Sequence, residues 1–261
     1  MVAFLHHIPP GVYGQAAPAT RTPLDTRRFR PMTQVWGHRG ASGAAPENTL
    51  AAFELAVRLG AHGVELDAQR SADGVVVVVH DETVDRTTAG TGRVVDLTAD
   101  QLAALGIPTL AQVLDLLAPT GLRVNVELKN GVEPYPGLVE DVEAVTAASR
   151  LAADAPERIL YSSFNHRSLA RLTELGSRVP RGVLHVEAMV RPWEYAASFG
   201  AQALHPMAVT VLAEEVALAH EAGMAVHAWT VDDPDAVRLL AAAGVDAVIT
   251  NVPDVALAAL A

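Results

Sequence analysis

Nine short extended segments alternate with helical segments from Gln34 onward, and this alternation limits the fold more than any other feature. The expected strands cover residues 34–38, 63–68, 75–80, 122–128, 158–163, 182–186, 203–205, 225–230 and 247–251. Neighbouring parallel strands need a crossover of a dozen or more residues, usually a helix. The pattern is therefore typical of βα units around a parallel sheet.

The third expected strand does not fit this scheme, because only the turn around Asp73-Gly74 separates it from the second. We interpret residues 75–80 as the return arm of a hairpin, which leaves eight parallel strands. The predicted fold class is α/β, a (β/α)8 TIM barrel. Residues from about 81 to 106 form an expected small insertion after the second-strand hairpin.

Helix signals support this count. Leu50, Phe53 and Val57 recur at helical spacing, and Gly60 follows them as an expected C-cap. Thr98 and Gln101 have the spacing of a capping box.

The chain length agrees with one barrel, since 261 residues with 50% hydrophobic content can bury a large core. We expect a single TIM-barrel domain at residues 32–261. Residues 1–31 are rich in Pro, Thr, Arg and Ala and are expected to form a flexible tail. Their short apolar patch has no basic segment before it, which makes a poor signal peptide.

Composition excludes several functions. The chain has no cysteine, which excludes disulfides and thiolate metal sites and fits a cytoplasmic location. A net charge of −11 argues against nucleic acid as a partner. No run of 18 apolar residues exists, so we expect no stable membrane association. The expected partner is a small molecule, and the oligomeric state is left open.

Acidic residues lie at the ends of two expected barrel strands, where barrel enzymes carry their chemistry. Glu65 and Asp67 share one face of their strand, roughly 7 Å apart beside an apolar core. An unpaired carboxylate there would stay protonated, whereas a bound cation would favour both ionised forms. Together with Glu127 they predict a hard divalent ion, Mg, Ca or Mn.

Two histidines and two cations accompany these acids. The hairpin brings His80 back toward His38, and both have side chains that suit general acid and base chemistry near neutral pH. Arg39 and Lys129 would bind an anion that contacts the metal. For Glu127 and Lys129 the alternative interpretation is a simple ion pair with no function. Together these residues predict a phosphoryl-transfer centre.

The chain resembles the glycerophosphodiester phosphodiesterase family, in the motif order HRG, PENT, ELD, HD and ELK, and in PTLAQVL, VHAWTV and VDAVITN. The resemblance implies a metal-dependent TIM barrel that hydrolyses glycerophosphodiesters to glycerol 3-phosphate and an alcohol. The family's metal ligands are matched by Glu65, Asp67 and Glu127. Its acid and base are matched by His38 and His80, and its phosphate contacts by Arg39 and Lys129. In the mechanism that the resemblance implies, a glycerol hydroxyl attacks phosphorus and water then opens the cyclic phosphate.

Three further residues have two interpretations each. Asn48 either caps a helix or contacts the site. Trp229 either packs in the core or, as similar tryptophans do in the family, walls the substrate pocket. His205 either contacts the glycerol or closes the barrel.

Two alternative functions stay open. A lysophospholipase D-like or sphingomyelinase D-like barrel would need an apolar docking loop, and residues 81–106 are mostly polar. A catalytically silent barrel that binds phosphodiesters would need the metal and the cations but not both histidines.

Overall fold

Eight parallel strands close into a barrel in residues 32–261, the residues that this computed structural model describes. Closure occurs because β1 (Gln34–His38) pairs with β2 (Gly63–Arg70) on one side and with β9 (Ala247–Thr250) on the other. The strands between them are β4 (Arg123–Leu128), β5 (Ile159–Ser163), β6 (Arg181–His185), β7 (Ala203–Pro206) and β8 (Ala225–Ala228). The predicted TIM barrel is confirmed. The expected tail at residues 1–31 lies outside the described residues.

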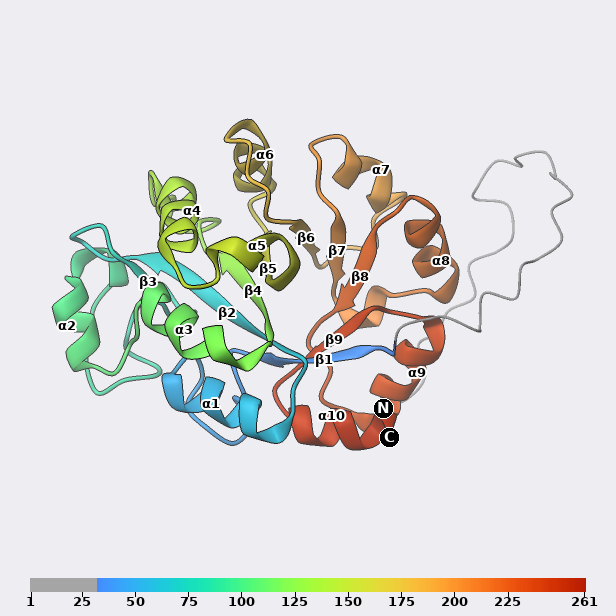
Figure 1. Ribbon diagram of the computed structural model, residues 1–261, viewed down its shortest axis with the longest axis horizontal. Coiled ribbons are helices and arrows are strands. Elements are labelled where there is room, and N and C mark those ends of the chain that lie inside the picture. Colours follow the sequence, from blue (N-terminus) through green and yellow to red (C-terminus); the bar gives the residue numbers. More distant parts are fainter. Residues whose placement is uncertain (1–31) are drawn as a thin grey trace, which may run out of the picture. The chain divides into compact units, whose positions relative to one another are not determined.

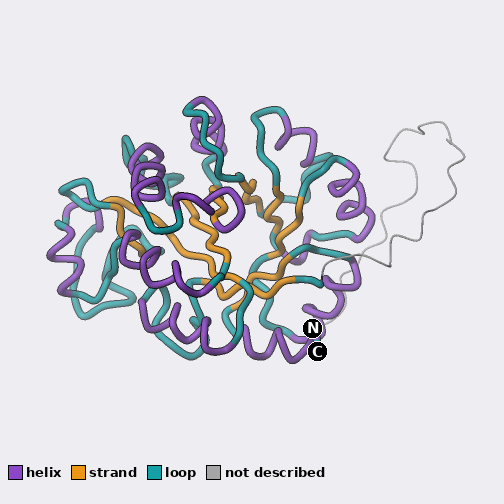
Figure 2. Tube along the Cα trace, viewed as in Figure 1, coloured by secondary structure: helices purple, strands orange, loops and turns teal. Residues whose placement is uncertain are grey.

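Helices surround the strands as an outer layer (Figures 1 and 2). They are α1 (Leu50–Leu59), α2 (Ala99–Ala104), α3 (Leu110–Leu117), α4 (Leu138–Ala148), α5 (Ala155–Arg158), α6 (His166–Glu174), α7 (Pro192–Ala197), α8 (Ala213–Glu221), α9 (Pro234–Ala243) and α10 (Pro253–Leu260). Short 3-10 turns cover Val94–Asp96, Ala118–Thr120, Ala152–Asp154 and Ala208–Thr210. Among the helices of residues 32–261, none combines the length and apolar character that a membrane crossing needs.

Helix ends follow the sequence signals with one correction. Gly60 ends α1 in a left-handed conformation, and Thr98 and Gln101 form the expected capping box of α2. The cap of α1 is Thr49, whose side chain accepts from the Ala52 amide. The capping interpretation of Asn48 is therefore wrong.

Strand alternation separates an apolar layer from a polar mouth. On β2, Val64 and Leu66 face the helices and belong to the main core, with no exposed surface. Glu65 and Asp67 alternate with them and therefore face the barrel interior. The same parity on β4 turns Glu127 inward, because it is the register partner of Asp67.

The predicted hairpin is present. β3 (Val76–Val78) pairs antiparallel with the end of β2, and the turn between them includes Gly74 at a φ of 85°. The segment after β3 has a small core of its own against the barrel edge, made of Val77, Val79, Val84, Val94, Leu102 and Ile107. This core supports the loop that begins at His80.

Candidate active site

Three buried carboxylates form the centre of the barrel mouth. Glu65, Asp67 and Glu127 each place one oxygen within 4.8 Å of the others, and we call them the acid cluster. They are 3%, 1% and 9% exposed. Glu65 Oε1 is buried without a hydrogen-bond partner. This is a donor set of oxygens close enough for one divalent ion.

Electrostatics within the acid cluster favour a bound cation. Burial and then the charge of Asp67 raise the pKa of Glu65 well above its ordinary value, and the same causes raise the pKa of Glu127 to about 7. Burial opposes ionisation of Asp67 as well, but Arg39 and Lys129 hold its pKa below the ordinary value. A divalent ion would supply the positive charge that three ionised carboxylates need.

Two cations border the acid cluster. Lys129 Nζ lies 3.2 Å from Glu127 Oε1 and 3.8 Å from Asp67 Oδ1. Arg39 Nε lies 3.2 Å from Asp67 Oδ2, as an ion pair without hydrogen-bond geometry. These contacts include the ion pair of Glu127 and Lys129, but they extend to a second acid and to Arg39. Both cations also line the pocket described below.

The loop after β1 is held in an uncommon conformation that brings Arg39 to this position. Arg39 and Asn48 have φ angles of 55° and 57°, in the left-handed region that non-glycine residues rarely adopt. The Arg39 amide donates to Glu65 Oε2 at 2.9 Å. Asn48 Nδ2 donates to Asp67 Oδ2 at 2.8 Å, so the interpretation of Asn48 as a site contact agrees with the structure. Such strain is common where a site fixes the backbone.

His38 is anchored through a neutral amide. Its Nδ1 lies 2.7 Å from Asn251 Oδ1, and Asn251 Nδ2 donates to Asp232 Oδ2 at 2.6 Å. Because Asp232 fixes the orientation of that amide, Oδ1 accepts and the His38 proton resides on Nδ1. Nε2 then faces Glu65 Oε2 at 3.9 Å. Burial and then Arg39 lower the pKa of His38.

His80 is anchored through a carboxylate instead. Its Nδ1 lies 2.6 Å from Asp81 Oδ1. Gln69 on β2 holds this turn, because its Nε2 donates to the carbonyls of Val79, His80 and Asp81 at 3.0, 2.8 and 2.8 Å. The hairpin therefore positions His80 and its carboxylate partner, Asp81, together.

Arg86 connects the two sides of the mouth, and sequence reasoning missed it. Its guanidinium contacts both oxygens of Asp81, at 2.6 and 3.0 Å, and both oxygens of Glu47, at 2.8 and 2.7 Å. Glu47 Oε1 also accepts from Arg39 Nη1 at 2.8 Å. Hydrogen bonds from Arg86, together with the charge and hydrogen bond of Arg39, lower the pKa of Glu47 to about 2, although burial opposes this. We call this chain from His80 to Arg39 the Arg86 network.

One pocket is lined by both histidines, both cations and two of the three acids. The mouth pocket is lined by His38, Arg39, Glu65, His80, Asn125, Glu127, Lys129, Phe164, Leu184, Trp229 and Ile249. Trp229 therefore walls the pocket, while it also packs against the interior cluster around Trp36. His205 has no exposed surface and lies under the pocket, hydrogen-bonded to His227 at 2.9 Å. The glycerol-contact interpretation of His205 is thus not supported.

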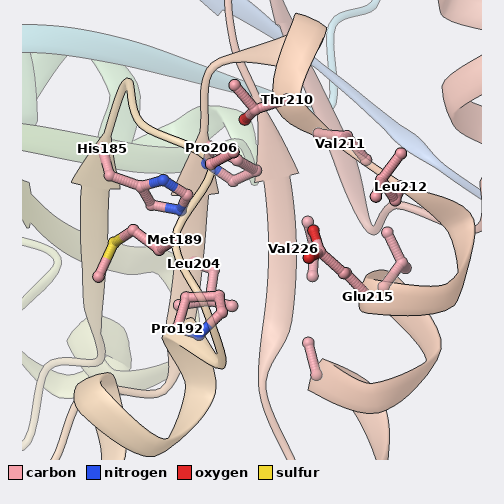
Figure 3. Close-up of a pocket in the computed structure, with 13 residues that line it drawn as sticks. His185, Met189, Pro192, Leu204, Pro206, Thr210, Val211, Leu212, Glu215 and Val226 are labelled. Atoms are coloured by element: carbon pink, nitrogen blue, oxygen red, sulfur yellow. The ribbon is translucent and has the colours of Figure 1, made fainter. Parts of the chain in front are cut away.

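A second hollow lies outside the barrel wall, between the strands and α7 and α8 (Figure 3). Leu204, Val226 and other apolar side chains line it, with His185 at one end. The Nε2 atom of His185 has no hydrogen-bond partner, and Nδ1 bonds to the Glu187 carbonyl. This hollow lies on the far side of β6–β8 from the acid cluster, so we assign it no part in the chemistry.

The comparisons with known proteins agree with this geometry. The sequence model of the glycerophosphoryl diester phosphodiesterase family matches residues 38–255. A glycerophosphodiester phosphodiesterase of Caldanaerobacter subterraneus subsp. tengcongensis is 38% identical over 235 residues, which cover 85% of this chain and 95% of that protein. A second, from Bacillus altitudinis, is 34% identical and covers 85% of this chain and 96% of that one.

Solved structures give the same result. An Oleispira antarctica phosphodiesterase in complex with the product sn-glycerol-3-phosphate superposes with a TM-score of 0.77 at 30% identity, over 87% of this chain and 96% of that one. The glycerophosphodiester phosphodiesterase of Thermotoga maritima gives 0.73 at 28% identity, over 88% and 99%.

Proposed function

The chain belongs to the glycerophosphoryl diester phosphodiesterase family and hydrolyses glycerophosphodiesters, and we propose that the residues of the mouth pocket carry that reaction. The observation that supports this most is the acid cluster, with three oxygens within 4.8 Å, two of whose members line one pocket with His38 and His80. The products are glycerol 3-phosphate and an alcohol. A catalytically silent barrel is set aside, since the relatives are named as enzymes.

The proposed metal ligands are Glu65, Asp67 and Glu127. The unpaired Oε1 of Glu65 and the mutual repulsion of the three carboxylates fit a hard divalent ion, with Mg, Ca and Mn as candidates. Such an ion, when bound, polarises a phosphoryl oxygen as a Lewis acid. The acids that hold it also hold Arg39 and Lys129, whose positive charges are proposed to bind the phosphate oxygens.

The anchors of the two histidines support different roles. His38 keeps its Nδ1 proton on a neutral amide, which leaves Nε2 free to accept a proton. His80 instead has a negatively charged partner, because its Nδ1 lies 2.6 Å from the Asp81 carboxylate, which holds the ring in one orientation. We therefore assign His38 as the base and His80 as the acid in the first step.

Protons balance over the two steps. His38 takes the proton of the attacking glycerol hydroxyl, and His80 protonates the departing alkoxide as the cyclic phosphate forms. His80 then takes a proton from water as its oxygen attacks phosphorus. His38 returns its proton to the glycerol oxygen as the ring opens. Both histidines end in their starting states.

Activity assays test this proposal directly. Glycerophosphocholine, glycerophosphoethanolamine and glycerophosphoglycerol are incubated with the protein and Mg, Ca or Mn, and glycerol 3-phosphate is measured. We expect release that stops when EDTA removes the ion. No release from any substrate with any of the three ions would refute the proposal.

Domain limits and location remain part of the proposal. The proposed catalytic domain comprises residues 32–261 with an insertion at about 81–106. A cytoplasmic location is supported by the absence of cysteine, and cell fractionation tests it.

A further inference from the structure

The hollow outside the barrel wall is lined by a buried histidine with an unsatisfied ring nitrogen (Figure 3). His185 is the last residue of β6 and is 5% exposed. Its neighbour Leu184 lines the mouth pocket instead, because successive side chains of a strand point to opposite faces. The hollow is therefore a second space, and the strand wall separates it from the mouth pocket.

The other ring nitrogen determines what His185 can offer to a ligand. Nδ1 lies 2.9 Å from the Glu187 carbonyl, and because a carbonyl can only accept, Nδ1 carries the proton. Burial lowers the pKa of His185, so the ring is neutral at pH 7 and its Nε2 is a hydrogen-bond acceptor. Nε2 has no partner among residues 32–261. A ligand that satisfies this atom must donate a hydrogen bond.

The remaining lining favours a small apolar ligand. Leu204 and Val226 line the hollow from β7 and β8, and Met189 and Leu212 line it from the segments before α7 and α8. With its open side included, the hollow measures about 360 Å³, close to the 380 Å³ of the mouth pocket. Both volumes lie at the lower end of the range for small-molecule sites.

Charge narrows the class of ligand further. Figure 3 shows Glu215 across the hollow from the His185 ring. This carboxylate and the net charge of −11 repel an anion. An ammonium ion would lose its hydration against the apolar side chains. A neutral hydroxyl group donates a hydrogen bond without either cost.

We propose that this hollow is a second ligand-binding site, which takes a compact apolar molecule with one hydroxyl group, and that this hydroxyl donates to His185 Nε2. The site lies outside the reaction proposed for the mouth pocket and does not depend on it. Phenols are suitable probes, because the Met189 thioether can make favourable contact with an aromatic ring.

A pair of ligands with nearly equal shape tests the proposal. In 4-fluorotoluene a methyl group replaces the hydroxyl group of 4-fluorophenol, and fluorine NMR titration of the full-length protein measures both affinities. We expect 4-fluorophenol to bind with a dissociation constant on the order of 1 mM. Absence of binding at about 10 mM would overturn the proposal. So would tighter binding of 4-fluorobenzylamine or 4-fluorobenzoate than of the phenol.

A variant connects the affinity to the acceptor. In His185→Phe the ring stays and the acceptor is lost, so the preference for 4-fluorophenol over 4-fluorotoluene should fall about ten-fold. His62→Phe is the matched control, because His62 is exposed and lies between α1 and β2, away from the hollow. Its preference should equal that of the wild type. An unchanged preference in His185→Phe would overturn the role of Nε2.

Crystals of the wild-type protein give a test that does not depend on the variant. After soaking in 4-fluorophenol, we expect density for the ring between His185 and Leu212, with the hydroxyl oxygen within hydrogen-bond distance of Nε2. Density for a water molecule alone at Nε2, or for the phenol only in the mouth pocket, would overturn the proposal. Because both readouts are binding and not turnover, they are separate from the test of the proposed function.

Discussion

Arg86→Gln should slow the enzyme although Arg86 lies outside the mouth pocket and contacts no proposed metal ligand. The variant loses four charge-assisted hydrogen bonds, two to Asp81 and two to Glu47. Those acids anchor His80 and Arg39. Without the bridge, the proposed acid and the proposed phosphate contact both lose their fixed orientation.

The size of the expected loss in kcat/KM follows from the exposure of the Arg86 side chain. Arg86 is 49% exposed, so each of its two forked pairs is expected to contribute about 0.5–1 kcal/mol rather than a buried-pair value. A total of about 1.4 kcal/mol corresponds to about a ten-fold loss in kcat/KM. The kcat/KM of Arg86→Lys should lie between those of the wild type and Arg86→Gln. Lysine keeps the positive charge, but its ammonium group cannot bind both oxygens of each carboxylate as the planar guanidinium does.

The assay compares two leaving groups. Ethanol needs a proton as it departs, whereas p-nitrophenolate leaves readily without one. If the Arg86 network positions His80 as the acid, Arg86→Gln loses about ten-fold with the ethyl diester but only about three-fold with the p-nitrophenyl diester, because that substrate feels only the loosened Arg39 and not the loosened acid. A structural defect would lower both equally.

The control for this experiment is Arg93→Gln. Arg93 is 53% exposed in the same insertion and pairs with Glu133 alone among the acids of residues 32–261. We expect its kcat/KM to equal that of the wild type with both substrates. The reasoning would be refuted if Arg86→Gln kept wild-type activity, or if both arginine variants lost activity to the same extent.

Three other predictions concern the histidines and the barrel interior. His80→Ala should abolish turnover of alkyl diesters and leave metal affinity nearly intact; a comparable loss of Mn²⁺ binding in calorimetry would mean that His80 is misassigned. Asn251→Leu should lower kcat about ten-fold, because His38 loses the acceptor at 2.7 Å that fixes its tautomer. The unfolding free energy of this variant should lie within about 1 kcal/mol of the wild-type value. A wild-type kcat would argue against this anchor. Gly182→Ala should reduce the unfolding free energy by about 1–3 kcal/mol in urea titration, since the added Cβ would lie 2.4 Å from His205 Nε2. Gly131→Ala, where nothing lies within 4 Å of the added atom, is its control and should change stability by less than about 1 kcal/mol.

The fold could be predicted because its signals are local. Strand runs, helix caps and the short hairpin turn all lie within a few residues of the feature they specify. Strand limits were less accurate. The expected strand at residues 75–80 is shortened to Val76–Val78, because the carbonyls of Val79, His80 and Asp81 accept from the Gln69 side chain instead of from a strand amide.

Part of the site could be predicted because the ends of adjacent parallel strands meet. This rule brings Glu65, Asp67 and Glu127 together without knowledge of the loops. The remaining contacts depend on how loops fold over the mouth. Arg86 reaches Glu47 across 39 positions, and His38 reaches Asn251 across 213, and no local pattern specifies either contact.

The Asn48 interpretation shows the same limit in one residue. An Asn before an apolar helical segment is typical of an N-cap. The left-handed φ of 57° instead turns Asn48 toward Asp67, and Thr49 takes the cap. The Asn48 amide also donates to the Arg39 carbonyl at 3.0 Å, a contact with the preceding loop that the capping pattern does not indicate.

The most direct measurement is Mn²⁺ binding to the full-length chain, by calorimetry and by anomalous scattering from crystals. The account predicts one saturable ion per chain among the oxygens of Glu65, Asp67 and Glu127, and at least about ten-fold weaker binding in Asp67→Asn. It would be contradicted by crystals grown in millimolar Mn²⁺ that show no anomalous peak among these three carboxylates.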